Sequence, residues 1–141
     1  MRNSLIAAAL VLSQITRVPR TEEWIPVRVV SLNYPIVAAQ AQIAGTVQIV
    51  IALNDRGIVQ DIVSETGNSI LAAAAERNIR TWKFGRLPGA GKTSIGRTVR
   101  VTYVFKLEDV SHSTTPQSKF MYEYPETATI TVPRPHWQPR R

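Results

Sequence analysis

The chain has 141 residues, 44% of them hydrophobic, which suits one domain with a modest core. Its net charge of +7 favours an anionic partner, namely nucleic acid, lipid head groups or an acidic protein surface. The chain has no cysteine, which excludes disulfides, thiolate metal sites and a cysteine-linked lipid anchor.

Residues 1–13 predict a signal peptide for export. Arg2 supplies a positive start, and Leu5–Leu12 is an uninterrupted apolar run of 8 residues. That run is too short to span a bilayer as a helix, which takes about 20 apolar residues. Two alternatives stay open: a short buried helix, or a true start further upstream that would add an inner-membrane anchor.

Residues 14–33 are expected to form an extended lead-in, because Pro19 and Pro26 disfavour a helix. A short helix is predicted over 34–44, with Pro35 in its first turn and Gly45 just past its end.

A hairpin follows this helix. Residues 45–53 alternate apolar and polar side chains, which predicts a strand with one buried face. Residues 54–57 supply a turn, and 58–64 read as the returning strand.

A second helix is predicted over 70–83, where the apolar stripe recurs at helical spacing in Leu71, Ala75, Ile79 and Trp82. After a glycine-rich loop over 84–96, residues 97–107 alternate again and predict a third strand. The expected fold is α+β: a two-layer αββαβ domain with a three-stranded antiparallel sheet and two helices on one face.

Residues 108–141 form a Pro-rich basic tail. Within it, Thr127–Val132 has the composition of a strand. We predict that this segment folds back on the edge of the last strand of the domain, because proteins usually cover an exposed sheet edge.

Residues 34–107 resemble the TonB C-terminal domain family. The family begins with a Tyr-Pro-x-x-Ala motif, has a glycine turn between its first two strands, a Trp-x-Phe pair after its second helix and a valine-rich final strand. The matching positions here are Tyr34, Pro35, Ala38, Ile43, Gly45, Asp55, Gly57, Val59, Gly67, Leu71, Trp82, Phe84 and Val99–Phe105. The sequence departs from the family pattern at Ala39, Ser64 and Arg86.

The resemblance implies a non-enzymatic periplasmic protein-binding domain, like the receptor-binding end of the TonB energy transducer. It implies that an extended segment of an outer-membrane TonB-dependent receptor adds to the last strand. The partner-binding residues would be Thr98, Arg100, Thr102, Val104, Tyr34 and Pro35, and the structural motif residues Gly45, Gly57, Gly67, Trp82 and Phe84.

Other functions also stay open. The domain could be a stand-alone cell-envelope scaffold module without energy coupling, because the sequence shows neither a membrane-spanning helix nor a long Pro-rich spacer. A homodimer also stays open. An anionic-polymer or nucleic-acid binder is suggested by eight basic residues without an intervening acid, although such a run often only solubilises a surface: Arg77, Arg80, Lys83, Arg86, Lys92, Arg97, Arg100 and Lys106.

Catalytic and cofactor motifs are not predicted. The Gly89–Thr93 stretch resembles a phosphate-binding loop, but Arg86 stands where that motif needs a glycine, and a strand rather than a helix follows. His112 and His136 lie 24 residues apart without converging donors, so no metal site is expected. We expect no enzyme activity, no cofactor and no small-molecule substrate.

Overall fold

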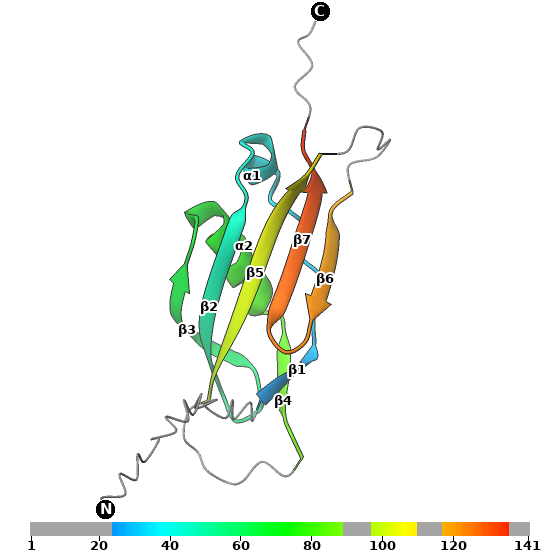
Figure 1. The fold of residues 1–141 in the computed structure, drawn as a ribbon. Helices are drawn as coiled ribbons and strands as arrows, with labels where there is room; N and C mark the ends of the chain where they lie inside the picture. The colour runs from blue at the N-terminus through cyan, green and yellow to red at the C-terminus, as the bar shows by residue number, and fades with distance from the viewer. Residues whose placement is uncertain (1–23, 89–96, 110–116, 136–141) are drawn as a thin grey trace, which may run out of the picture.

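The computed structural model describes residues 24–88, 97–109 and 117–135. These residues form a five-stranded sheet in the order β3-β2-β5-β7-β6 and a two-stranded sheet of β1 and β4 (Figure 1). The elements in chain order are β1 (Trp24–Arg28), α1 (Ile36–Gln40), β2 (Gly45–Leu53), β3 (Val59–Thr66), α2 (Ser69–Ile79), β4 (Lys83–Arg86), β5 (Thr98–Glu108), β6 (Lys119–Glu123) and β7 (Thr127–Pro133). The predicted signal peptide over 1–13 lies outside the described residues.

The α+β class was predicted correctly, but the three-stranded sheet was wrong. β2 pairs antiparallel with β3 and β5, as expected. The predicted return of Thr127–Val132 to the edge of the last domain strand is confirmed, since β7 pairs parallel with β5. β6, which was not predicted, adds a further strand antiparallel to β7. The mixed sheet arises because the tail returns beside β5 in the same direction, which an alternating pattern within one segment cannot reveal.

The second sheet was not predicted either. β1 pairs antiparallel with β4, which occupies Lys83–Arg86 at the start of the expected loop. In Figure 1 this pair lies at the lower end of the five-stranded sheet. The two strands are separated by more than 50 residues in sequence, so each is stabilised by a partner that local composition does not indicate.

The helices cover one face of the sheet and one end of it. α2 lies behind the sheet in Figure 1, whereas the short α1 lies at the upper end. The Asn68 side chain caps α2 by accepting hydrogen bonds from the backbone N–H groups of Ile70 and Leu71, at 2.9 and 3.4 Å. Neither described helix is long and apolar enough to cross a bilayer.

The core lies between α2 and the sheet. The predicted helical stripe is buried, and so are the alternating side chains of β2 and β5. Trp82 occupies the centre, with its ring 6.0 Å from that of Tyr103 and 5.4 Å from that of Tyr122. Because Tyr122 belongs to β6, the C-terminal tail contributes side chains to the hydrophobic core.

The turn between β2 and β3 depends on a glycine. Gly57 has φ +76°, and a Cβ there would lie 1.7 Å from the backbone oxygen of Phe84. Asn54 tightens the same turn, because its side-chain oxygen accepts hydrogen bonds from the N–H groups of Arg56 and Ile58.

Candidate protein-binding site

The predicted partner-binding strand, β5, is covered over only part of its length. On one side it pairs with β2 from Thr98 to Phe105, and on the other it pairs with β7 from Thr102 to Glu108. The N–H of Thr102 donates to the carbonyl of Glu126 at 2.7 Å, where the parallel pairing begins. Within the described residues, the stretch from Thr98 to Val101 has no strand partner on the β7 side.

The four residues predicted on this strand therefore lie in two environments. Thr98 and Arg100 lie in the open stretch, whereas Thr102 and Val104 lie opposite Thr127 and Thr129 of β7. All four alternate with the buried side chains of β5, so they lie on the sheet face away from the core.

The structure places the other two predicted site residues away from this edge. The Tyr34 ring is buried and lies 5.5 Å from the Phe105 ring in a T-shaped arrangement. The Tyr34 hydroxyl donates to the carbonyl of Ile43, and its backbone N–H donates to the Ser118 hydroxyl at 3.0 Å. Burial raises the pKa of Tyr34. Pro35 is half-buried beside α2.

The predicted structural residues occupy constrained positions. Gly57 and Gly67 have positive φ, and a Cβ on Gly67 would lie 2.6 Å from the Thr46 carbonyl oxygen. Gly45 opens β2. Trp82 and Phe84 are both buried, with their rings 6.3 Å apart.

The basic residues do not form one surface. Arg100 and Lys106 lie on the sheet face opposite the helices, whereas Arg77 lies on α2 and Arg80 is the C-cap residue of that helix. Others are already engaged: Arg80 pairs with Glu76, Arg97 pairs with Asp55, and the Arg86 guanidinium lies 5.8 Å from the centre of the Trp24 ring. Lys92 lies outside the described residues. Among the residues that the structure describes, this scatter gives no continuous basic track for a polyanion.

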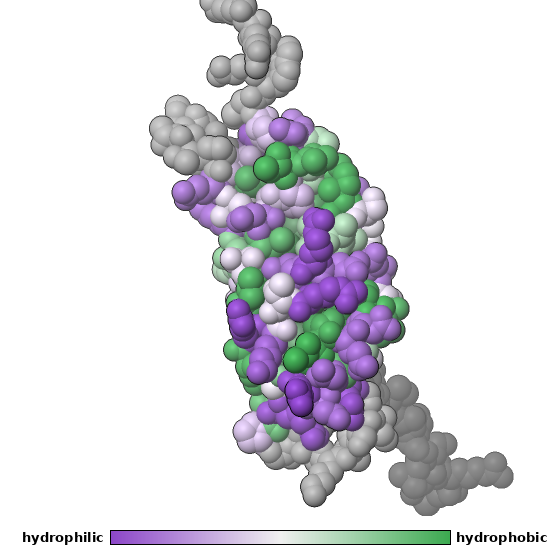
Figure 2. Space-filling view, turned by 180° about the vertical axis from the view of Figure 1, so that it is seen from behind, coloured by the Kyte–Doolittle hydropathy of each residue, from purple (hydrophilic) through white to green (hydrophobic). Residues whose placement is uncertain are grey.

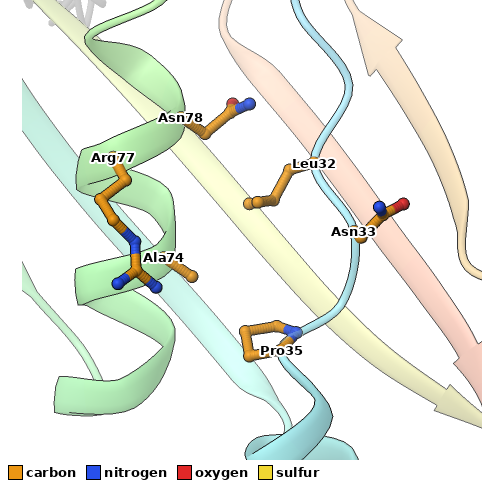
Figure 3. Close-up of a pocket in the computed structure, with 6 residues that line it drawn as sticks. All are labelled: Leu32, Asn33, Pro35, Ala74, Arg77 and Asn78. Carbon is orange, nitrogen blue, oxygen red and sulfur yellow. The ribbon is translucent and has the colours of Figure 1, made fainter.

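A groove lies between α2 and the chain that precedes α1 (Figure 3). Its volume is about 290 Å³, and it is lined by Leu32, Asn33, Pro35, Ala74, Arg77 and Asn78. Leu32, Pro35 and Ala74 point toward one another across it, and Asn33 points away.

The rear wall of the groove is fixed by Asn78, which the sequence analysis overlooked. Its side-chain N–H groups donate to the carbonyls of Val30 and Ser31, at 3.0 and 3.2 Å. Its side-chain oxygen accepts from the Trp82 indole N–H and the Tyr103 hydroxyl, both at 2.9 Å. The sequence did contain an indication of this role. Asn78 directly precedes Ile79 and lies on the buried side of an alanine-rich helix, where a side-chain amide needs hydrogen-bond partners.

Catalytic groups do not converge at either place. No cluster of three metal-binding side chains occurs among the residues that the structure describes. His112, His136 and the Gly89–Thr93 stretch lie outside them.

A family model for the C-terminal domain of the TonB protein of Gram-negative bacteria matches residues 30–107, more than half of the chain. The chain belongs to the TonB C-terminal domain family. This family consists of non-enzymatic periplasmic protein-interaction domains, so the chain is a TonB-like interaction module. The match stops before β6 and β7, of which β7 supplies the parallel cover of β5. Searches of curated proteins and of solved structures found no match.

Proposed function

We propose that this module binds an extended segment of an outer-membrane TonB-dependent receptor by strand addition at Thr98–Val101. The observation that carries the proposal is the open stretch of β5 in a member of the TonB C-terminal domain family. Thr102 directs its N–H toward β7, and backbone groups of a strand point to the same side every second residue. Thr98 and Arg100 therefore present the groups that a partner strand would pair with.

The geometry limits this binding to a short segment. An added strand would lie end to end with β7 and would meet the turn between β6 and β7. Only the four residues from Thr98 to Val101 are open to it, so the backbone contributes few hydrogen bonds. We expect weak, reversible binding that depends little on salt, unlike binding to a polyanion.

Photo-crosslinking in a Gram-negative host tests the proposal. A benzophenone amino acid at Thr98 or Arg100 should form an adduct with an outer-membrane protein. The same amino acid at Lys106, on the same face of the same strand but in the covered half, should form little. Equal adducts from Lys106, or none from Thr98 and Arg100, would contradict binding at this edge.

A second candidate is a cell-envelope scaffold module without energy coupling. The cover of β5 by β7 favours it, because most of the family's last strand is already paired within the chain. In that case the crosslinked partners would be envelope proteins other than transport receptors, which mass spectrometry of the adducts distinguishes.

We also propose that the chain is exported through the predicted signal peptide. Fractionation of the native host and N-terminal sequencing should find a periplasmic protein that begins near Gln14. An uncleaved protein in the inner membrane would instead support an anchor, and a cytoplasmic protein would contradict export.

A further inference from the structure

The groove between α2 and residues 32–35 is shaped for side chains rather than for a larger ligand. Its volume of about 290 Å³ lies at the lower limit for small-molecule sites, which span about 300–1,000 Å³. The side chains of Leu32, Pro35 and Ala74 form the apolar part of its lining, beside the polar Arg77 and Asn78 (Figure 3). An aliphatic side chain of a partner matches both the size and the polarity of this space.

The apolar surface continues beyond the groove. Ile36 and Val37 follow Pro35 in the chain, and they are 74% and 62% exposed. Figure 2 shows hydrophobic side chains gathered over α1 on this side of the molecule. An exposed apolar patch next to a groove is typical of a protein-interaction surface.

One charged group is available at the groove. Arg77 lies on its wall, and no ion pair joins it to another residue in the described part of the chain. The neighbouring acid, Glu76, is already paired with Arg80 at 3.0 Å. The Asn78 amide is also fully used by its four hydrogen bonds. A guanidinium in this position fits a carboxylate, which it can bind through two parallel hydrogen bonds.

We infer that this groove binds a peptide segment of a partner protein that carries an aliphatic side chain beside an acidic one. The aliphatic group occupies the space between Pro35 and Ala74, and the carboxylate pairs with Arg77. The inference rests on the proposed function as a protein-binding module, but it uses a surface separate from the open stretch of β5.

NMR spectroscopy of the ¹⁵N-labelled chain tests the inference. The probe is an acetylated, amidated peptide of sequence Gly-Asp-Leu-Leu-Asp-Gly, and its matched control has asparagine in place of aspartate. The aspartate peptide should shift amide signals of residues 32–37 and 70–78. The asparagine peptide should bind about tenfold more weakly, as expected for the loss of a charge-assisted contact.

Arg77→Glu should weaken binding of the aspartate peptide by at least the same factor. Lys106→Glu is the matched control, because it makes the same change from a basic to an acidic side chain on the sheet face opposite the helices, and it should bind nearly as the wild type does. Both side chains are exposed, so both variants should keep the native amide spectrum.

Three results would overturn the inference: equal binding by Arg77→Glu, equal binding of the two peptides, or no shifts at millimolar peptide. The crosslinking test of β5 remains separate. If Arg77→Glu still forms adducts through Thr98, failure at the groove leaves the proposed function intact.

Discussion

At the scale of single residues, Asn78 joins three parts of the molecule. It connects α2 to the chain before α1, to the indole of Trp82 and to the hydroxyl of Tyr103 on β5. Every hydrogen-bonding position of its amide is used, so a buried polar group that would otherwise destabilise the core is satisfied.

Asn78→Ala should therefore destabilise the fold by about 2–4 kcal/mol, since each buried polar group left without a partner costs about 1–3 kcal/mol. The Trp82 indole keeps a second acceptor, the Val30 carbonyl at 3.2 Å, which limits the loss. Urea denaturation measures the change. The exposed neighbour provides a control: Arg77→Ala should stay within about 0.5 kcal/mol of the wild type. If the two variants were equally stable, the hydrogen bonds of the Asn78 amide would not stabilise the fold.

Tyr103 gives the fold a sensitivity to alkaline pH. Burial raises its pKa above that of an ordinary tyrosine. Above about pH 10 the tyrosines of the unfolded chain lose their protons, while the folded chain keeps the proton on Tyr103. The free energy of unfolding should therefore be unaffected by this group below pH 10 and should fall as the pH rises further.

The midpoints of urea denaturation, measured between pH 8 and pH 11.5, test whether the stability falls at alkaline pH. In Tyr103→Phe the alkaline fall should be smaller, although the variant is less stable at neutral pH because it loses its hydrogen bond to Asn78. An identical alkaline fall in both proteins would assign the effect to other groups, of which Tyr34 is one because burial also raises its pKa.

At the scale of elements, the hairpin of β6 and β7 is an integral part of the sheet. Ala128, Ile130 and Val132 of β7 are buried, and Tyr122 of β6 contacts Trp82. Each large apolar side chain buried in this way stabilises the fold by about 1.5–3 kcal/mol. Detaching the hairpin would cost a large fraction of the roughly 5–15 kcal/mol that stabilises a typical domain, so the covered half of β5 stays covered.

Ile130→Ala should lower the free energy of unfolding by about 2–5 kcal/mol, as expected for a fully buried aliphatic side chain. Thr129→Ala changes the preceding residue, which lies on the sheet face away from the helices, and it should have little effect on the free energy of unfolding. Hydrogen exchange provides the second measurement: the Thr102 amide, which donates to Glu126, should exchange faster in Ile130→Ala. If the exchange rate of the Thr102 amide is the same in Ile130→Ala and in the wild type, the packing of β7 does not protect this part of β5.

At the scale of the whole molecule, the elements that were predicted are those with a pattern of their own. The alternations over 45–53 and 97–107 became β2 and β5, and the stripe over 70–83 became α2. The helix ends earlier than predicted, at Ile79, because the N–H groups of Thr81 and Trp82 bond to carbonyls only three residues back. The first helix ends at Gln40 rather than Ala44, because Gln42 adopts φ +55°.

The missed features depend on contacts between distant segments. β4 forms because Trp24–Arg28 lies beside it, and β6 forms because β7 lies beside it. The groove combines residues more than 40 positions apart, from Leu32 to Asn78. Pro35 was predicted at a binding site only through the family resemblance, and Arg77 was predicted only as one charge in a basic run. No local pattern brings those two residues together.

The irregular edge of the sheet at β3 bears on how the molecule behaves among its own copies. Its pairing with β2 shifts register twice, opposite Val50/Ile51 and opposite Ala52/Leu53. The same strand exposes Asp61 and Glu65. Bulges and charges of this kind prevent another chain from continuing the ladder. β3 is one of the two edge strands of the five-stranded sheet, so these features hinder growth of the sheet from that edge and should limit aggregation at high local concentration.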